Sequence, residues 1–503
     1  MIQNILVLGA GSAGLLSALS LKKKFPQLAV RVVRSSEMGV IGVGEGTTPA
    51  MPRHLFEHLG MNPATFYARA EPTWKLGIRF LWGPREHFDY TFSNQLDAQW
   101  NNLPRPNGFY AHDEFRWNDL QAALMADGKA FPRNPKGGGP DMSGGFGFHI
   151  ENKKLVETLE IMAAELGVTF TEGKVSGTER GPGGLSALLL EDGQRLEADF
   201  FIDCSGFRSE LLGRALAEPF VSYDRALFCD RAVIGGWERT TEPILPYTIA
   251  ETMDAGWAWQ IEHEHHINRG YVYCSQFISD DEACAEFQRK NPQAPASPRV
   301  VKFRSGRYAR VWVDNVVAIG NAAGFVEPLE ATALMVVTQQ CQHLTTMFEH
   351  TAMQPTPTGR ALYNKLIVES FDDTRDFLAL HYKLNTRLDN PFWRHCVADT
   401  DMGGLGPLLD FYKENGPTGV ARYTLPTQMS NFGIEGYLVM LVGNKAPYKA
   451  RHVATSAEQH AWTTNRSAYM ATALQGLTVA ESLRIIRSPH WQWNNESAVR
   501  QAA

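Results

Sequence analysis

The sequence is poor in cysteine, in excess basic charge and in long apolar runs. Its six cysteines are scattered and form no CxxC pair, which fits a reducing compartment better than a disulfide framework. The 48 basic and 54 acidic residues give a net charge of −6, so a dedicated nucleic-acid-binding protein is not expected. No stretch reaches the roughly 18 uninterrupted apolar residues of a transmembrane span, and we predict none.

Internal repeats are also missing, which excludes a solenoid or propeller. The apolar segment 5–21 has no basic residue before it, so it is not expected to be a signal peptide. A chain of 503 residues with 44% hydrophobic and 20% charged residues has the composition of a globular protein. We therefore expect a cytoplasmic protein with no membrane partner and no nucleic-acid partner.

The pattern of apolar residues predicts an α/β fold. A buried strand (5–8), a glycine turn, a helix ending before Pro26 and a second strand (29–33) form a βαβ unit. Beyond residue 331 the apolar spacing becomes helical. Further expected elements are a helix at 153–166, strands at 188–190 and 200–203, and a sheet within 220–315.

The glycine turn has the pattern GxGxxG between a strand and a helix. We expect Gly9 to permit the tight turn, Gly11 to let the backbone approach a pyrophosphate, and Gly14 to let the helix pack on the strand. The first helical residues, Ser12 and Ala13, then present their amides to the phosphates. This context predicts a dinucleotide site.

The position that usually binds the adenosine ribose is atypical. An acidic residue is expected about 20 residues after the turn, but Arg34 stands there and cannot accept a hydrogen bond. Glu37 is the alternative acceptor. Arg34 also suits a phosphorylated ribose, so this position does not decide between cofactors.

Three later segments favour FAD over a nicotinamide cofactor, because a flavin needs several backbone loops to cover its pyrophosphate, ribityl chain and ring. The candidate cofactor-binding residues in the first and last of these segments are Gly42, Val43, Gly44, Glu45, Gly320 and Asn321. The middle segment is DCSGFR at 203–208, which follows a predicted strand.

Five motifs together resemble the flavin-dependent halogenases of the tryptophan-halogenase family. They are IGVGEGTTP, WKLGIRF, DCSGFRS, GWAWQI and GNAAGFVEPLEAT, in the family's order, and the resemblance spans about residues 4–345. It implies a Rossmann-type, flavin-monooxygenase-like fold with an added, mostly helical substrate region. The domains expected from it are an FAD-binding part (1–80), an inserted segment (81–147), the remainder of the FAD module (148–345) and a helical C-terminal region (346–503).

Lys75 is the candidate catalytic amine. Residues 74–80 alternate, with Lys75 and Arg79 on one face, and this pattern alone favours an amphipathic strand with a solvated basic face. The resemblance instead places Lys75 at the family's catalytic lysine, which hydrogen-bonds hypohalous acid or becomes a haloamine. Burial suits either role because desolvation lowers the pKa of an amine.

Glu330 is the candidate partner of Lys75. At the start of a helix it is typically an acidic residue that offsets the helix dipole. The resemblance implies that it polarises the halogenating species or accepts the proton of the substituted ring. The amides of Thr332 and Ala333 are implied to hold halide, although the family more often has Ser-Thr-Gly where this chain has Ala331-Thr332-Ala333.

Trp257 and Trp259 lie on one face of a predicted strand. They suit a cross-strand aromatic cluster, with a turn at 268–270 and a partner strand at 271–273. The resemblance implies a wall between substrate and flavin. Glu262 stands where the family has proline, and this departure keeps direct oxygen transfer to the substrate open as an alternative reaction. The nearby His263 and His265 share a face, but no further ligand supports a metal and we expect none.

The resemblance therefore implies an enzyme that uses FADH2 from a separate NAD(P)H flavin reductase, O2 and chloride or bromide. It halogenates an electron-rich aromatic such as indole or tryptophan. The oligomeric states left open include a homodimer. The alternatives are a flavin-dependent monooxygenase or epoxidase and a non-catalytic FAD-binding protein. The candidate substrate-lining residues are 109–112, Phe392, Trp393, Trp462, Trp491 and Trp493.

Overall fold

The computed structural model describes residues 1–36, 44–93, 109, 113–295 and 298–493. Its chain forms two compact units. Unit 1 comprises Met1–Glu71, Ile150–Tyr223 and Phe303–Asp372, and unit 2 comprises Pro72–His149, Asp224–Lys302 and Asp373–Ala503. The predicted residues Glu37, Gly42, Val43 and 110–112 lie outside the described residues.

Unit 1 is built on a six-stranded sheet with the order β20-β21-β12-β1-β2-β8. Its elements are β1 (Asn4–Leu8), α1 (Ser12–Lys24), β2 (Ala29–Arg34), β8 (Thr169–Glu172), β12 (Phe200–Asp203), β20 (Trp312–Val313) and β21 (Val316–Ala318). β1 pairs in parallel with both β2 and β12, and its residues Leu6 and Val7 are buried. The predicted βαβ unit is therefore confirmed.

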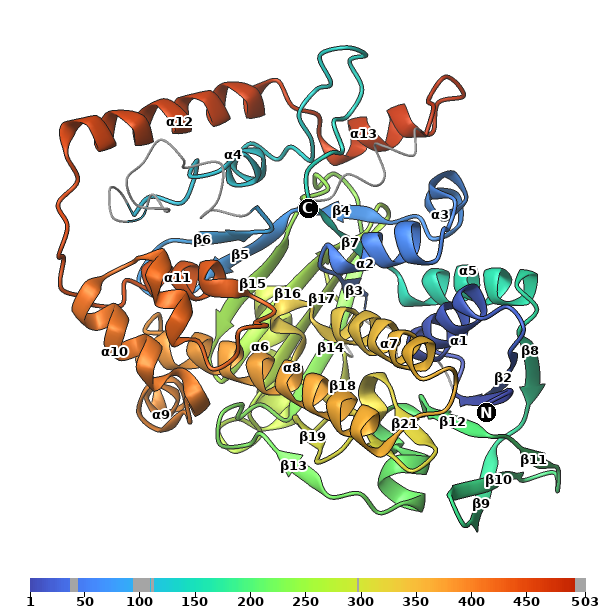
Figure 1. Ribbon diagram of the computed structural model, residues 1–503. Coiled ribbons are helices and arrows are strands. Elements are labelled where there is room, and N and C mark those ends of the chain that lie inside the picture. The colour runs from blue at the N-terminus through green and yellow to red at the C-terminus, as the bar shows by residue number, and fades with distance from the viewer. Residues whose placement is uncertain (37–43, 94–108, 110–112, 296–297, 494–503) are drawn as a thin grey trace. The chain divides into compact units, whose positions relative to one another are not determined.

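Helices α5 (Asn152–Glu165) and α7 (Ala333–His350) both pack against α1 (Figure 1). The predicted helix at 153–166 and the strand at 200–203 are confirmed. The other elements of unit 1 are β3 (Glu45–Gly46), α2 (Ala50–Arg53), α3 (Pro63–Arg69), β9 (Val175–Gly181), β10 (Gly184–Leu190), β11 (Arg195–Glu197), β13 (Phe220–Ser222), β19 (Gly306–Tyr308) and β22 (Gly324–Phe325).

Unit 2 contains a seven-stranded sheet with the order β18-β14-β17-β16-β15-β5-β6. Its strands are β5 (Gly77–Leu81), β6 (Phe88–Thr91), β14 (Arg231–Glu238), β15 (Thr248–Met253), β16 (Gly256–Glu262), β17 (His266–Tyr273) and β18 (Arg299–Lys302). Separately, β4 (Thr73–Lys75) pairs antiparallel with β7 (Gly147–Ile150). The predicted sheet within 220–315 is thus confirmed.

The predicted turn at 268–270 is wrong. These residues lie inside β17, and the chain turns instead between His263 and His266. Gly270 stands opposite Trp259 in the ladder, where a Cβ would lie 2.1 Å from the Trp259 ring. The glycine is therefore present to admit an indole ring.

The described C-terminal part is helical, as predicted. α8 (Pro357–Leu384) divides between the units at Asp372. The remaining helices of unit 2 are α4 (Leu120–Ala126), α6 (Asp280–Lys290), α9 (Pro391–Asp399), α10 (Gly406–Asn415), α11 (Gly433–Gly443), α12 (Ser456–Leu474) and α13 (Val479–Ile486). Within this unit α12 packs along α4 (Figure 1). Among the described residues no helix is long and apolar enough to span a bilayer.

Candidate active site and cofactor site

In the glycine turn of unit 1, two glycines are required by close backbone contacts and the third lies beside open space. Gly9 has a φ of +110°, and a Cβ on it would lie 2.4 Å from the carbonyl oxygen of Cys204. A Cβ on Gly14 would lie 1.9 Å from the carbonyl oxygen of Gly9, whereas one on Gly11 would meet no atom within 4 Å. Gly11 is the N-cap of α1 and makes no side-chain cap. The orphan amides at the start of α1 therefore face open space that suits a phosphate.

Arg34, at the end of β2, is engaged within unit 1. Its guanidinium pairs with Glu160 and lies 3.3 Å from a carboxylate oxygen of Glu172. The ring of Phe170 packs below it, 5.1 Å from the guanidinium carbon. Arg34 therefore has carboxylate and aromatic partners within unit 1, at the position where the dinucleotide pattern usually has an acidic residue.

A polar chain connects the glycine turn to β3. The Ser12 hydroxyl donates to Oδ1 of Asn152 at 2.8 Å, and Nδ2 of Asn152 donates to Oε1 of Glu45 at 3.4 Å. Burial raises the pKa of the Glu45 carboxyl to about 7. Gly44, next to it, is buried. The structure thus brings the predicted residues Ser12 and Glu45 to one place through Asn152, which the sequence did not single out.

The loop containing Gly320 and Asn321 lies against α1. A Cβ on Gly320 would be 2.8 Å from the Cβ of Ala13, so two predicted cofactor residues are neighbours. Gln340 of α7 holds this loop, accepting from the Gly320 amide at 2.9 Å and donating to the Ala318 carbonyl at 3.3 Å. Sequence reasoning missed Gln340, because no local pattern marks a side chain that contacts a loop 20 residues away.

A small, partly open pocket lies beside this loop. Its lining residues, all in unit 1, are Gly320, Asn321, Gly324, Phe325, Val326, Thr332, Ala333, Val336 and Phe371. Thr332 is the N-cap of α7 and makes no side-chain cap. The predicted halide residues Thr332 and Ala333 therefore lie in the same pocket as Gly320 and Asn321.

Glu330 ends the short helical turn Pro328–Glu330 that precedes this pocket. Its side chain is only 4% exposed. The next residue, Ala331, has a φ of +55°, in the left-handed region that costs a non-glycine residue about 1 kcal/mol. This bend separates Glu330 from the first residues of α7.

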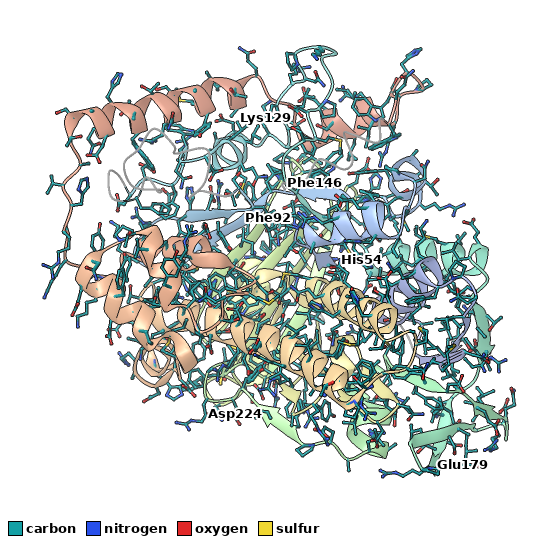
Figure 2. All side chains as sticks on the ribbon, viewed as in Figure 1. His54, Phe92, Lys129, Phe146, Glu179 and Asp224 are labelled. Atoms are coloured by element: carbon teal, nitrogen blue, oxygen red, sulfur yellow. The ribbon has the colours of Figure 1, made fainter. Side chains whose placement is uncertain are left out.

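Lys75 lies in β4 of unit 2 and is fully buried. The solvated basic face predicted by pattern alone is therefore wrong, and Arg79 instead forms a bidentate pair with Asp89. The Lys75 amine lies 5.6 Å from the centre of the Phe92 ring, which follows β6 and is labelled in Figure 2. An ammonium at this distance gains cation–π stabilisation.

His149 shares the face of the ladder on which Lys75 lies. Thr73 pairs with His149 and Lys75 with Gly147, so alternation places the side chains of Thr73, Lys75 and His149 on one face. Nε2 of His149 lies 2.8 Å from the Thr248 hydroxyl. Burial, followed by the positive charge of Lys75, holds the pKa of His149 well below its usual value.

Trp257 and Trp259 are buried and share one face of β16, as predicted. Their ring centres are 6.2 Å apart. Nε1 of Trp259 is buried and has no hydrogen-bond partner among the described residues. The pair therefore presents an apolar wall with one unused donor.

Glu262 and Arg239 form a buried ion pair of unit 2. Gln260 donates to the other carboxylate oxygen of Glu262 at 2.7 Å, and Arg239 also donates to the carbonyl of His263 at 2.9 Å. The charge that replaces the motif proline is thus neutralised inside the sheet. In the part of the chain that the structure describes, no group of His, Cys, Asp and Glu side chains could hold a metal ion.

The predicted aromatic residues of the C-terminal region divide between core and periphery. Trp393 is buried, and its indole nitrogen donates to the carbonyl of Met253 at 2.8 Å. Phe392 packs on Trp393, and Trp462 is buried on α12. Trp491 and Trp493 contact each other edge to face at 5.9 Å. Phe392 and Trp393 therefore pack in the interior of unit 2.

Comparisons with known proteins agree with this arrangement. The chain matches the tryptophan halogenase family over residues 4–459. It is 34% identical to tryptophan 7-halogenase KtzQ of Kutzneria sp., over 83% of this chain and 82% of that protein.

Solved structures also resemble it. MibH, a lanthipeptide tryptophan 5-halogenase, has a TM-score of 0.88 at 36% identity, covering 96% of this chain and 93% of MibH. Xcc4156, a flavin-dependent halogenase from Xanthomonas campestris, has a TM-score of 0.84 at 27% identity, covering 96% of this chain and 98% of Xcc4156. The glycine turn before α1 agrees with these comparisons, because it fits a dinucleotide. This chain belongs to the tryptophan halogenase family and is a flavin-dependent halogenase.

Proposed function

We propose that this enzyme oxidises chloride or bromide and transfers the halogen to the indole ring of tryptophan, free or within a peptide. The named activities of KtzQ and MibH support an indole substrate. The observation that carries the proposal is the burial of Lys75, whose amine lies over the Phe92 ring in unit 2. Burying an amine is costly because desolvation disfavours its charged form, and the proposed halogen transfer uses such an amine.

The cofactor is FAD, held by unit 1 and delivered as FADH2 by a separate NAD(P)H flavin reductase. Gly9, Gly11, Ser12, Ala13 and Gly14 receive the pyrophosphate at the start of α1. When bound, the reduced flavin supplies the electrons with which O2 converts halide to hypohalous acid. The remaining predicted cofactor residues are Glu37, Gly42, Val43, Gly44, Glu45, Gly320 and Asn321.

Each reacting group of the chain has one role in this proposal. The amides of Thr332 and Ala333 hold halide, and Lys75 either hydrogen-bonds hypohalous acid or, as the free amine, exchanges a proton for the halogen and releases water. Glu330 accepts the proton that leaves the substituted ring. Trp257 and Trp259 exclude the aromatic substrate from the flavin. The domains of the enzyme are an FAD-binding part (1–80), an inserted segment (81–147), the remainder of the FAD module (148–345) and a helical C-terminal substrate region (346–503).

The test is a reaction with FAD, NADH, a generic flavin reductase, O2 and either halide. Free tryptophan and tryptophan-containing peptides are the substrates, and products are identified by mass spectrometry. We expect products with halogen isotope patterns from the wild type, and at least ~100-fold less from Lys75→Met, because covalent or hydrogen-bonding catalysis is removed while the apolar volume is kept.

Lys302→Met is the matched control, since Lys302 is an exposed lysine of the same unit on β18. It should keep wild-type activity. A product that gains only oxygen, formed without halide, would contradict the proposal and indicate a monooxygenase. Full activity of Lys75→Met would remove Lys75 from the reaction.

A further inference from the structure

The polar chain Ser12–Asn152–Glu45 has a fixed direction. The carbonyl oxygen of Asn152 accepts from Ser12 and its amide nitrogen donates to Glu45. Ser12 is the first residue of α1, directly after the open position Gly11. Two hydrogen bonds therefore connect the Glu45 carboxyl to the helix end that fits a phosphate.

The charged residues Lys154, Glu71 and Glu151, near Asn152 in the sequence or in contact with α5, pair with one another. Lys154 of α5 lies 2.7 Å from carboxylate oxygens of both Glu71 and Glu151. Burial is the cause of the raised pKa of Glu45. Among the described residues, the neutral Asn152 amide donates to the Glu45 carboxyl and in turn accepts from the Ser12 hydroxyl.

A dinucleotide brings negative charge to this place. Its pyrophosphate carries two charges, and an ionised carboxylate in the same low-dielectric site would repel it. A protonated carboxyl removes this repulsion and adds one O–H donor. The electrostatic cost of keeping Glu45 ionised rises further when the cofactor enters.

We propose that Glu45 takes up one proton from solvent when FAD binds, so that the cofactor site contains a neutral carboxylic acid and FAD affinity falls as pH rises. The inference rests on the proposed binding of FAD to unit 1. No other bond forms or breaks in this step, and the proton returns to solvent when FAD leaves.

The experiment measures FAD binding to the full-length protein between pH 6 and 9. The dissociation constant comes from quenching of flavin fluorescence, and the number of protons comes from calorimetry in buffers that differ in ionisation enthalpy. For one linked group with a pKa of about 7 in the free protein, we expect uptake of close to one proton at pH 8. The dissociation constant should then rise by up to about 50-fold from pH 7 to pH 9.

Glu45→Gln keeps the hydrogen bond to Asn152 and cannot titrate. It should bind FAD with the wild-type affinity of pH 6 at every pH, with no proton uptake. Glu179→Gln is the matched control, because Glu179, labelled in Figure 2, is a partly exposed glutamate of unit 1 on β9. Its carboxylate pairs with Arg195. That variant should keep the wild-type pH dependence.

Three results would overturn the inference: no proton uptake by the wild type, an affinity independent of pH, or an unchanged slope in Glu45→Gln. If Glu45→Gln lacks the near-ultraviolet circular dichroism of the folded protein, the proton count on the wild type decides alone. A wild type that binds no FAD at any pH would instead overturn the proposed cofactor site, and with it this inference. The failures of the two proposals are therefore distinguishable.

Discussion

Lys75 and His149 lie on one face of the β4–β7 ladder, and both are fully buried. Two positive charges on one buried face repel each other strongly. Burial and then the charge of Lys75 lower the pKa of His149, while the charges of His263 and Arg239 act in the same direction. Burial and the neighbouring cations therefore keep His149 neutral near pH 7.

Removing the charge of Lys75 should raise the pKa of His149. In Lys75→Met we expect the His149 titration to move upward, because only burial and the more distant cations remain to oppose protonation. The measurement is carbon-13 NMR of protein labelled at histidine Cε1, with the His149 signal identified by its absence in His149→Asn. Lys302→Met should leave this signal unmoved, and an unmoved signal in Lys75→Met would show that the two groups do not interact.

The sequence was sufficient for features that depend on local pattern. The βαβ unit, the helix α5 and the shared face of Trp257 and Trp259 follow from apolar spacing and glycine positions. The burial of Lys75 does not follow from this pattern. Alternating residues predict the same strand whether its polar face meets water or the protein interior. The resemblance to a family was needed to single out that lysine.

Other features depend on contacts between distant segments. Glu262 is neutralised by Arg239, which lies 23 residues earlier and directly follows β14, a strand separated from β16 by β17. Asn152 connects Ser12 to Glu45 although it follows Glu45 by 107 residues and Ser12 by 140. Glycine commonly marks turns, so Gly270 predicts one, whereas in the structure it lies opposite the Trp259 indole. Such pairings follow from strand register, which a single sequence does not provide.

Gly11→Ala and Gly14→Ala should separate cofactor binding from packing. Gly11 has room for a methyl group in the protein itself, so the substitution should leave the melting temperature near that of the wild type. FAD affinity should fall by ~10-fold to 100-fold, because the methyl group occupies the phosphate position. The test combines thermal unfolding without FAD and fluorescence titration with FAD.

Gly14→Ala, unlike Gly11→Ala, should lower the melting temperature, since its Cβ would lie 1.9 Å from the Gly9 carbonyl oxygen. We expect it to destabilise the protein before FAD is added. Equal FAD affinity in Gly11→Ala and the wild type would place the dinucleotide elsewhere.

His54 should make unit 1 less stable in acid. Burial, with a smaller effect of His58, lowers the pKa of His54, which is labelled in Figure 2, to about 4. The unfolded chain binds a proton below about pH 6.5 while the folded chain does not, so stability falls as pH decreases from 6.5 towards 4. From pH 7 to pH 5 the loss due to His54 should be about 2 kcal/mol.

His54→Gln should remove most of this loss, as measured by urea unfolding at the two pH values. His350→Gln changes an exposed histidine of the same unit and should leave the loss unchanged. An identical acid slope in His54→Gln and the wild type would show that His54 is not the group responsible.

Gly270→Ala should expel the Trp259 ring from its place on β17. The added Cβ would lie 2.1 Å from two ring carbons of Trp259, whose indole is buried. Overpacking of this kind typically costs up to about 3 kcal/mol. We therefore expect a lower urea midpoint and altered tryptophan fluorescence, whereas Gly137→Ala, at a glycine with no atom near its Cβ, should change neither. The double variant Gly270→Ala with Trp259→Leu should recover part of the stability lost, because the smaller side chain accepts the methyl group; strictly additive losses would show that the indole does not rest on Gly270.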